Sequence, residues 1–281
     1  MTSAIRRRVR WRRATPQDRD WLTERLAADR DRPGTIRYLG PLGSAEGEGI
    51  RDFRVAERDG AWAACLATSQ HQCVPCGDPE LLQLAGPPSR RWRLAVSDRP
   101  AMEACLGDDL AGPGVIVHDQ VLMSRPTDAI EPTQADPGVR LAEMADLDGL
   151  AQLAVTLHVD DGFGPHPGKA GVAGYRDRMA AMIPAHRLFV VGPVGAPYAK
   201  LQLSVASPTW GTQLAGIVVR ATERGHGVAQ GLVAEVVRRS LALRPGLPIT
   251  LHVRRANARA IAVYHHVGFQ EVDDWLLAVR P

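Results

Sequence analysis

Residues 216–231, GIVVRATERGHGVAQG, constrain the fold more than any other part of this chain. The β-branched residues before Arg220 favour a strand, and the apolar residues after Gly227 recur at helical spacing. The sequence therefore predicts a strand, a glycine turn and a helix that starts at Gly225 to Gly227. Because the first amides of a helix are unpaired and carry partial positive charge, such a turn is typical of a pyrophosphate site.

Three kinds of phosphate loop are separated by their spacing. A Walker loop needs Lys and then Ser or Thr after its last glycine, whereas Val228 and Ala229 follow Gly227. A dinucleotide fingerprint needs Gly or Ala at the position of Gln230, and no clear ribose-binding acid follows. The third pattern is Arg or Gln, two residues, Gly, one residue, then Gly or Ala, and Arg224, Gly227 and Ala229 satisfy it. It resembles the acetyl-coenzyme A loop of GNAT-type N-acetyltransferases.

A second motif follows between residues 249 and 269, where a strand pattern leads to an N-cap at Asn257 and a helix stop at Gly268. Asn257, Ala260, Tyr264, Gly268 and Phe269 resemble the corresponding GNAT motif in register. Both motifs occur in the order of that family. Their joint occurrence identifies the superfamily and says almost nothing about the substrate.

The resemblance implies an α/β (α+β) chain with the GNAT fold, a mixed and mostly antiparallel central sheet flanked by helices. It implies an acyl-CoA dependent N-acetyltransferase that transfers acetyl from acetyl-CoA to a primary amine by direct attack, without a metal. The expected contacts with coenzyme A are Ile217, Val219, Arg224, Gly225, His226, Gly227, Val228, Ala229 and Asn257. Tyr264 is the expected proton donor, because a phenol of pKa ~10 is matched to a thiol of pKa ~8.5.

The acceptor side is expected between the first two helices of the second half, in HVDDGFGPHPG, residues 158–168. The resemblance makes His158, Asp160, Asp161 and His166 candidate substrate contacts, and a solvated turn is the alternative. The acceptor amine must lose a proton, yet residues 209–219 contain no Asp, Glu or His to act as base. Asp160 or Asp161, acting through water, is therefore the candidate base.

The chain of 281 residues exceeds one ordinary domain, and its Pro-rich polar segment, residues 124–138, predicts a boundary near residue 130. We expect a degenerate GNAT-like domain over residues 1–130, without a coenzyme loop because residues 37–42 have the wrong spacing, and a catalytic domain over residues 131–281. The strand-helix outline at Val9 returns 130 residues later, where Val9, Arg10 and Asp18 recur as Val139, Arg140 and Asp148. Two unrelated strand-helix starts are the alternative. The layout resembles actinobacterial acetyltransferases with an extra N-terminal domain.

Charge and cysteine content bear on other classes of protein. Residues 1–13 hold six arginines and no acid, but nucleic-acid binding would rest on this segment alone, and an RNA-binding signature is missing. The C-x-x-C at Cys73 and Cys76 lacks a second ligand pair, so buried thiols are favoured over a zinc site or a redox pair. No apolar run is long enough for a membrane span, and no signal peptide is recognised, so a cytoplasmic protein is expected.

Two rival functions remain at this point. A non-catalytic coenzyme A binding or regulatory module would keep the glycine turn but show no turnover. A nucleic-acid-associated protein with a basic tail would bind through residues 1–13. The preferred partners are acetyl-CoA and a small-molecule amine, with a homodimer as a further expectation.

Overall fold

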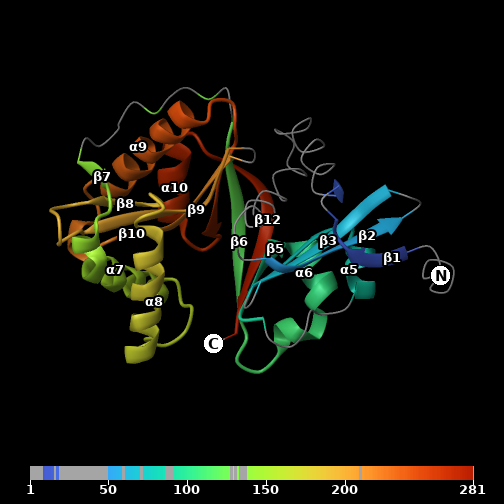
Figure 1. Ribbon diagram of the computed structural model, residues 1–281. Coiled ribbons are helices and arrows are strands. Elements are labelled where there is room, and N and C mark those ends of the chain that lie inside the picture. Colours follow the sequence, from blue (N-terminus) through green and yellow to red (C-terminus); the bar gives the residue numbers. More distant parts are fainter. Residues whose placement is uncertain are drawn as a thin grey trace. The chain divides into compact units, whose positions relative to one another are not determined.

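The computed structural model describes residues 9–15, 17–18, 50–58, 61–69, 72–85, 92–126, 129, 132, 138–208 and 211–280. The chain forms two compact units, one of Met1–Val121 with Asp273–Pro281 and the other of Leu122–Val272. Strands β6 (Ile116–Arg125) and β12 (Gln270–Val279) each contribute residues to both units. Within each unit, helices lie against a sheet (Figure 1).

The second unit holds a mixed sheet with helices on both faces. Along the chain its elements are β7 (Val139–Leu141), α7 (Leu147–Asp160), α8 (Gly168–Met182), β8 (Leu188–Val191), β9 (Ala199–Ser207), β10 (Gly211–Val219), α9 (Val228–Leu243), β11 (Ile249–Arg254) and α10 (Ala258–His266). Strands β7 to β10 pair in sequence order and antiparallel, whereas β10 and β11 are parallel. Strand β10, helix α9, strand β11 and helix α10 follow one another in the order that the two sequence motifs predict.

Apolar spacing explains how the helices of this unit pack. Helix α9 buries Leu232, Val233, Val236 and Val237, which recur at the helical spacing seen in the sequence. Helices α7 and α8 share a buried cluster with β8, which includes Leu150, Met179 and Leu188. Figure 1 shows α9 on one face of the sheet and α7 with α8 on the other. The sheet is therefore covered on both sides and fixed in position.

Strands β10 and β11 separate beyond a short paired region. Their parallel pairing runs from Thr212 opposite Ile249 to Leu214 opposite Leu251. Strand β10 then continues to Val219 and β11 to Arg254, and within residues 211–280 these extensions do not pair with each other. A strand edge without a partner strand can bind an extended ligand through its backbone. This edge leads directly into the predicted coenzyme turn.

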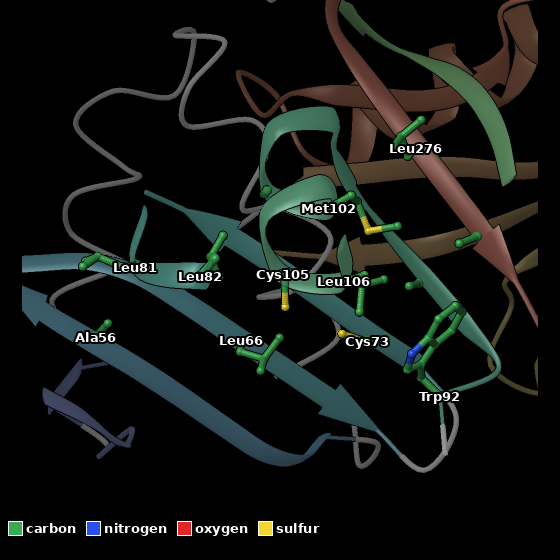
Figure 2. Close-up of a cluster of buried hydrophobic side chains, with 14 residues drawn as sticks. Ala56, Leu66, Cys73, Leu81, Leu82, Trp92, Met102, Cys105, Leu106 and Leu276 are labelled. Atoms are coloured by element: carbon green, nitrogen blue, oxygen red, sulfur yellow. The ribbon is translucent and has the colours of Figure 1, made fainter. Parts of the chain in front are cut away.

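The first unit repeats this arrangement. Its described elements are β1 (Val9–Arg13), β2 (Ile50–Arg58), β3 (Ala61–Ser69), β4 (Gln72–Gly77), α5 (Pro79–Ala85), β5 (Leu94–Asp98), α6 (Arg99–Leu106) and the 3-10 helix η1 (Gly107–Ala111). Strands β1 to β4 are antiparallel in sequence order, and β4 and β5 are parallel, as β10 and β11 are in the second unit. Its core includes Leu66, Leu81, Leu82, Met102 and Leu106 (Figure 2). A GNAT-like strand pattern thus occurs in both units.

The last strand of the chain completes the sheet of the first unit. Residues Trp275 to Val279 of β12 pair antiparallel with Leu94 to Asp98 of β5. The predicted division into residues 1–130 and 131–281 assigns this strand to the second domain. The compact units and the predicted domains therefore differ at the C-terminal end of the chain.

The same arrangement of an arginine and an aspartate occurs near the start of each unit. Arg12 donates two hydrogen bonds to the Asp18 carboxylate, at 2.6 and 2.7 Å, and Arg140 does the same to Asp146, at 2.7 and 2.8 Å. The spacing is 140 − 12 = 128 residues for the arginine and 146 − 18 = 128 for the acid. The predicted spacing of 130, which matched Arg10 with Arg140, is wrong by two residues.

The backbone around these pairs repeats as well. The Thr15 amide donates to Asp18 at 2.6 Å, and the Glu143 amide donates to Asp146 at 2.8 Å. Asp148, the predicted counterpart of Asp18, instead accepts a surface hydrogen bond from Arg176 at 2.8 Å. A few identical residues in the sequence could not distinguish a spacing of 130 residues from one of 128. The hydrogen bonds between each aspartate and its arginine distinguish the two spacings.

The C-x-x-C residues lie on strand β4 and face opposite sides, because residues three apart on a strand do so. Cys73 belongs to the buried core, while Cys76 lies 3.8 Å from the Ser97 hydroxyl. A hydrogen bond with Cys105 and burial raise the pKa of the Cys73 thiol well above its ordinary value. These thiols are buried, as predicted, and form no disulfide, and the described residues contain no group of three or more His, Cys, Asp or Glu suited to a metal ion.

The basic segment at the N-terminus enters strand β1 at Val9, and residues 1–8 lie outside the described residues, as do residues 37–42. Arg12 is held by Asp18 and Glu57, so its guanidinium is engaged within the unit. In the part of the chain that the structure describes, no helix combines the length and apolar character needed to cross a bilayer.

Candidate active site

The glycine turn lies where strand β10 gives way to helix α9. After Val219 the chain makes a 3-10 turn, Ala221–Glu223, and α9 begins at Val228 with Gly227 as its N-cap. Gly225 and Gly227 have φ of 83° and 77°, a left-handed region that other residues rarely adopt. A Cβ on either would meet no atom within 4 Å. Backbone conformation, and not crowding, therefore requires glycine at both positions.

This turn can bind an anion through backbone amides. The first α9 hydrogen bond runs from the Gly231 amide to the Gly227 carbonyl at 3.0 Å, so the amides of Val228 and Ala229 precede the helical ladder. No side chain caps this helix start, and His226 in the turn is exposed. Unpaired amides and the partial positive charge of the helix favour a bound phosphate.

Along the end of strand β10, the backbone N–H and C=O groups of successive residues are directed alternately toward β9 and away from it. The Arg220 amide donates to the Tyr198 carbonyl at 2.7 Å, which orients Arg220 toward β9. Since alternate residues of a strand direct their N–H and C=O groups to opposite sides, Ile217 and Val219 direct theirs away from β9. These are the two residues predicted to pair with the coenzyme, and their orientation supports that prediction.

Arg224 lies along this edge. Its Nε donates to the Val219 carbonyl at 2.8 Å, and its Nη2 donates to the Asp160 carboxylate at 2.6 Å. Asp160 is the last residue of α7, so the ion pair links the predicted acceptor segment to the predicted coenzyme turn. A bound phosphate would compete with the Asp160 carboxylate for the positive charge of Arg224.

Helix α10 carries the second motif. The Asn257 side chain accepts a hydrogen bond from the Ala260 amide at 3.1 Å and so caps the helix as predicted. Tyr264 is the buried residue of this helix, and its ring makes an edge contact with Phe269 at a centroid distance of 6.2 Å. Within the described chain its hydroxyl forms no hydrogen bond. The phenol is therefore available to a ligand.

Asp161, the residue after α7, is close enough to Tyr264 for its charge to be felt there. Burial raises the pKa of Tyr264, and the negative charge of Asp161 raises it further. Burial also raises the pKa of Asp161, Arg254 opposes this rise, and Asp160 adds to it. Among the described residues, the Asp161 carboxylate has no hydrogen bond and no ion pair. The end of α7 and helix α10 thus bring a carboxylate within electrostatic range of a phenol, and neither side chain forms a hydrogen bond among the described residues.

His158, a predicted substrate contact, lies on helix α7 and has a hydrogen-bond partner at each ring nitrogen. Its Nε2 lies 3.0 Å from the Pro165 carbonyl, which can only accept, so Nε2 carries the proton. Its Nδ1 then accepts from the Tyr175 hydroxyl at 2.9 Å. Because one ring nitrogen binds Pro165 in the segment after α7 and the other binds Tyr175 on helix α8, His158 links this segment to α8. His166 is exposed, and its Nδ1 accepts from the Gly168 amide at 3.2 Å.

Sequence reasoning missed three residues on β9 and β11. Arg254 ends β11 and donates to the Asp160 carbonyl at 3.4 Å. His252 lies on β11 just beyond the last pair with β10, and burial lowers its pKa to about 4. Lys200 on β9 is buried, and its Nζ donates to the Gly216 carbonyl at 2.8 Å. One signal was available, since Lys200 is one of only two lysines and follows an apolar stretch.

Comparison with known proteins gives a family for part of the chain. Residues 157–269, which lie within the second unit, match the model of the Acetyltransferase (GNAT) family. A search of curated proteins found no match.

Solved structures resemble the chain over nearly its whole length. A GNAT-family acetyltransferase from Colwellia psychrerythraea is 12% identical with a TM-score of 0.56, covering 97% of this chain and 100% of that one. A putative GNAT-family acetyltransferase from Novosphingobium aromaticivorans is 19% identical with a TM-score of 0.51, covering 89% and 98%. A tandem GNAT protein from the clavulanic acid biosynthesis pathway is 13% identical with a TM-score of 0.53, covering 96% and 97%.

Identities this low establish the fold alone. It is the GNAT fold, a mixed sheet flanked by helices, and the repeated strand pattern of the two units is consistent with a tandem arrangement. The family model matches from Leu157, within helix α7, to Phe269, three residues after helix α10, so this part of the second unit is similar to the GNAT acetyltransferase family.

Proposed function

We propose that the second unit transfers acetyl from acetyl-CoA to a primary amine of a small molecule by direct attack. The observation that carries this proposal concerns Asp161 and Tyr264, a carboxylate and a buried phenol that are close enough for the charge of Asp161 to raise the pKa of Tyr264, and whose side chains form no hydrogen bond among the described residues. They can act as the two proton-transfer groups that aminolysis of a thioester requires.

The coenzyme would be held by backbone and by charge. The amides of Val228 and Ala229 are suited to the pyrophosphate, and the outward groups of Ile217 and Val219 are suited to the pantetheine amides. Arg224 would add positive charge once released from Asp160. Glycine at 225 and 227 lets the phosphates approach the backbone closely.

Asp161 would remove the proton of the acceptor amine. A free alkyl ammonium with a lysine-like pKa near 10.4 is neutral in less than roughly one part in a thousand at pH 7, so a base is needed. The prediction from sequence left Asp160 and Asp161 as alternatives. Asp160 is neutralised by Arg224, whereas Asp161 has a raised pKa and is therefore the stronger base.

Attack by the neutral amine forms the C–N bond and a tetrahedral oxyanion, which an outward amide of the β10 edge could stabilise. Asp161 releases the ammonium proton to solvent and then takes the second amine proton from the tetrahedral intermediate. Collapse breaks the C–S bond, Tyr264 donates a hydrogen bond to the departing thiolate, and solvent supplies the proton that forms the thiol. The raised pKa of Tyr264 keeps the phenol protonated but makes it a weaker acid than the ordinary phenol assumed from sequence. A hydrogen bond to sulfur, with solvent completing the proton transfer, suits this pKa better than full transfer.

The first unit is, in this proposal, the degenerate GNAT-like domain. Where the second unit has a glycine turn, the first has only Asp78 between β4 and α5, with Pro79 at the first helical position. The Asp78 carboxylate accepts from the Glu80 amide at 2.9 Å. A carboxylate at this helix start repels a phosphate. A cytoplasmic location and a homodimer belong to the same proposal as expectations.

The test is thiol release from acetyl-CoA with a panel of amines, preceded by calorimetry of the full chain with coenzyme A. Binding with amine-dependent thiol release would support the proposal. Binding without turnover on any amine would favour a coenzyme A binding or regulatory module. Absence of binding would refute the proposal, and a salt-dependent nucleic-acid shift lost on deleting residues 1–13 would then favour the basic-tail function.

A further inference from the structure

Lys200 is a buried cation that the proposed reaction does not use. Only 1% of its surface is exposed, on a strand that helices cover on both faces. Burial lowers its pKa to about 8, so it is mostly protonated at neutral pH. A buried ammonium is costly unless it is hydrogen-bonded, and its described hydrogen bond goes to the Gly216 carbonyl, at 2.8 Å.

Gly216 lies in a β-bulge of strand β10. Ala215 pairs with Gln202, and the next pair is Val218 with Lys200, so that Gly216 and Ile217 face Leu201 alone. Gly216 has a φ of 58°, and a Cβ there would lie 2.7 Å from the Gln202 side chain. Glycine is thus required for conformation and for space. An extra residue in a bulge loses its place in the ladder, and Lys200 supplies the donor that the Gly216 carbonyl needs.

The bulge decides which backbone groups the open edge presents. Because the groups of successive residues alternate in direction, adding one residue to a strand exchanges the residues that face inward and outward. The bulge ends immediately before Val218, which pairs with Lys200, so that Ile217 and Val219 face away from β9. Lys200 therefore binds the bulge that determines which way the N–H and C=O groups of Ile217 and Val219, the predicted pantetheine-binding groups, are directed.

We propose that Lys200 is a positioning residue for the pantetheine arm of the coenzyme, acting through the Gly216 carbonyl and the bulge. The inference rests on the proposed function, because that function places the coenzyme along β10. Stability offers no competing reason for the ammonium, since an apolar residue of similar size in place of a buried charge is often neutral or stabilising.

The test compares two ligands on the full chain. Coenzyme A reaches both the glycine turn and the β10 edge, whereas adenosine 3′,5′-bisphosphate lacks the pantetheine arm. In Lys200→Met, calorimetry should show a loss of coenzyme A affinity of about tenfold or more, the usual effect of one charge-assisted hydrogen bond, and unchanged affinity for the nucleotide. The melting temperature should stay the same or rise. Lys200→Gln, which keeps an N–H donor, should recover part of the affinity.

Lys169 offers a matched control, because it is the other lysine of the chain and is exposed on helix α8. Lys169→Met should bind both ligands like the parent. The inference is overturned if Lys200→Met binds coenzyme A like the parent, or if it loses both ligands equally with a lower melting temperature, which would indicate a general structural role.

Amide hydrogen exchange separates this inference from the proposed function. In Lys200→Met without ligand, the amides from Gly216 to Val219 should exchange faster than in the parent while the rest of β10 stays protected. Unchanged exchange rates would refute the inference that the hydrogen bond from Lys200 to Gly216 stabilises the bulge. If exchange rises but the parent binds neither ligand, the structural role stands, and the proposed function and the coenzyme role of Lys200 both fail.

Discussion

The Arg224 guanidinium donates to the Asp160 carboxylate at 2.6 Å, across 64 positions of sequence. The same side chain binds the Val219 carbonyl at 2.8 Å. The Arg224 side chain, which is predicted to bind a phosphate, therefore lies on the strand edge that is predicted to bind pantetheine. A bound coenzyme would replace these contacts of Arg224 with contacts to its phosphates. Asp160, at the end of α7, and the coenzyme phosphates therefore compete for the same guanidinium.

Asp160→Asn should raise the affinity for coenzyme A, because it removes the charge that holds Arg224. Both side chains are nearly half exposed, at 46% and 44%, and such pairs contribute about 0–1 kcal/mol. The expected gain is thus at most about fivefold in calorimetry, and less at high salt. Asp148→Asn, which breaks the exposed pair with Arg176, is the control and should leave affinity unchanged. Weaker binding by the Asp160 variant would contradict this competition.

Gly227→Val should abolish coenzyme A binding. A β-branched residue is strongly disfavoured at a φ of 77°, so the turn would rearrange and its amides would no longer converge. Gly174→Ala is the matched control, because Gly174 lies within helix α8 and a Cβ there meets no atom within 4 Å. Calorimetry on folded variants decides, and unchanged affinity of Gly227→Val would remove the phosphate-turn assignment.

Tyr264→Phe should lower kcat by about 10- to 10²-fold, the usual effect of one hydrogen bond to a charged group, with little change in coenzyme affinity. The ring remains and keeps its edge contact with Phe269, so the core is preserved. Steady-state kinetics and calorimetry on the same preparation separate the two quantities. Turnover equal to that of the parent would show that the Tyr264 hydroxyl does not assist departure of the thiolate.

Asp161→Asn should lower kcat and remove the acidic limb of the pH profile. Asp161 acts only when deprotonated, so kcat/KM in the parent should fall as the pH drops through its raised pKa. The variant should also lower the pKa of Tyr264, because the neighbouring negative charge is gone. An acidic limb that persists in the variant would assign the base elsewhere, and His252→Ala would then be the variant to measure.

Glu235 should make folding stability depend on pH. Hydrogen bonds from Arg238 and then Arg239 lower its pKa from 4.5 to about 2. Because the folded pKa lies below the unfolded one, this contribution is complete above about pH 4.5 and is lost as the pH falls toward 2. Urea unfolding of the parent should lose on the order of 2 kcal/mol in this window, less than the full shift because Arg238 is 47% exposed.

Glu235→Gln should show a smaller loss over the same window. Arg239 also donates to the Val139 carbonyl at 2.7 Å, so this cluster fastens helix α9 to strand β7. Glu103→Gln, whose pair with Arg99 is exposed and 3.4 Å long, should behave like the parent. An equal pH dependence in the parent and the Glu235 variant would refute the assignment.

Local chemistry made the main elements of the site predictable from sequence. Gly227 must adopt a left-handed φ and Asn257 must cap a helix, and both requirements are met within a few residues of the position concerned. The strand before Arg220 and the apolar face of α9 follow from β-branched residues and helical spacing in the same way. Short-range backbone preferences were therefore sufficient for the glycine turn and for helix α10.

Tertiary structure alone decided which distant groups meet. Asp161 lies near Tyr264, and Arg224 binds Asp160, only because the end of α7 comes to the separated edge of β10 and β11. The ammonium of Lys200 reaches Gly216 only because a bulge breaks the pairing of two strands. The sequence determined the backbone conformations that each residue can adopt, because these depend on near neighbours. The fold determined which charged groups lie near one another, which hydrogen bonds form between distant residues and which residues of the two units correspond, because these depend on which strands pair and which helices pack together.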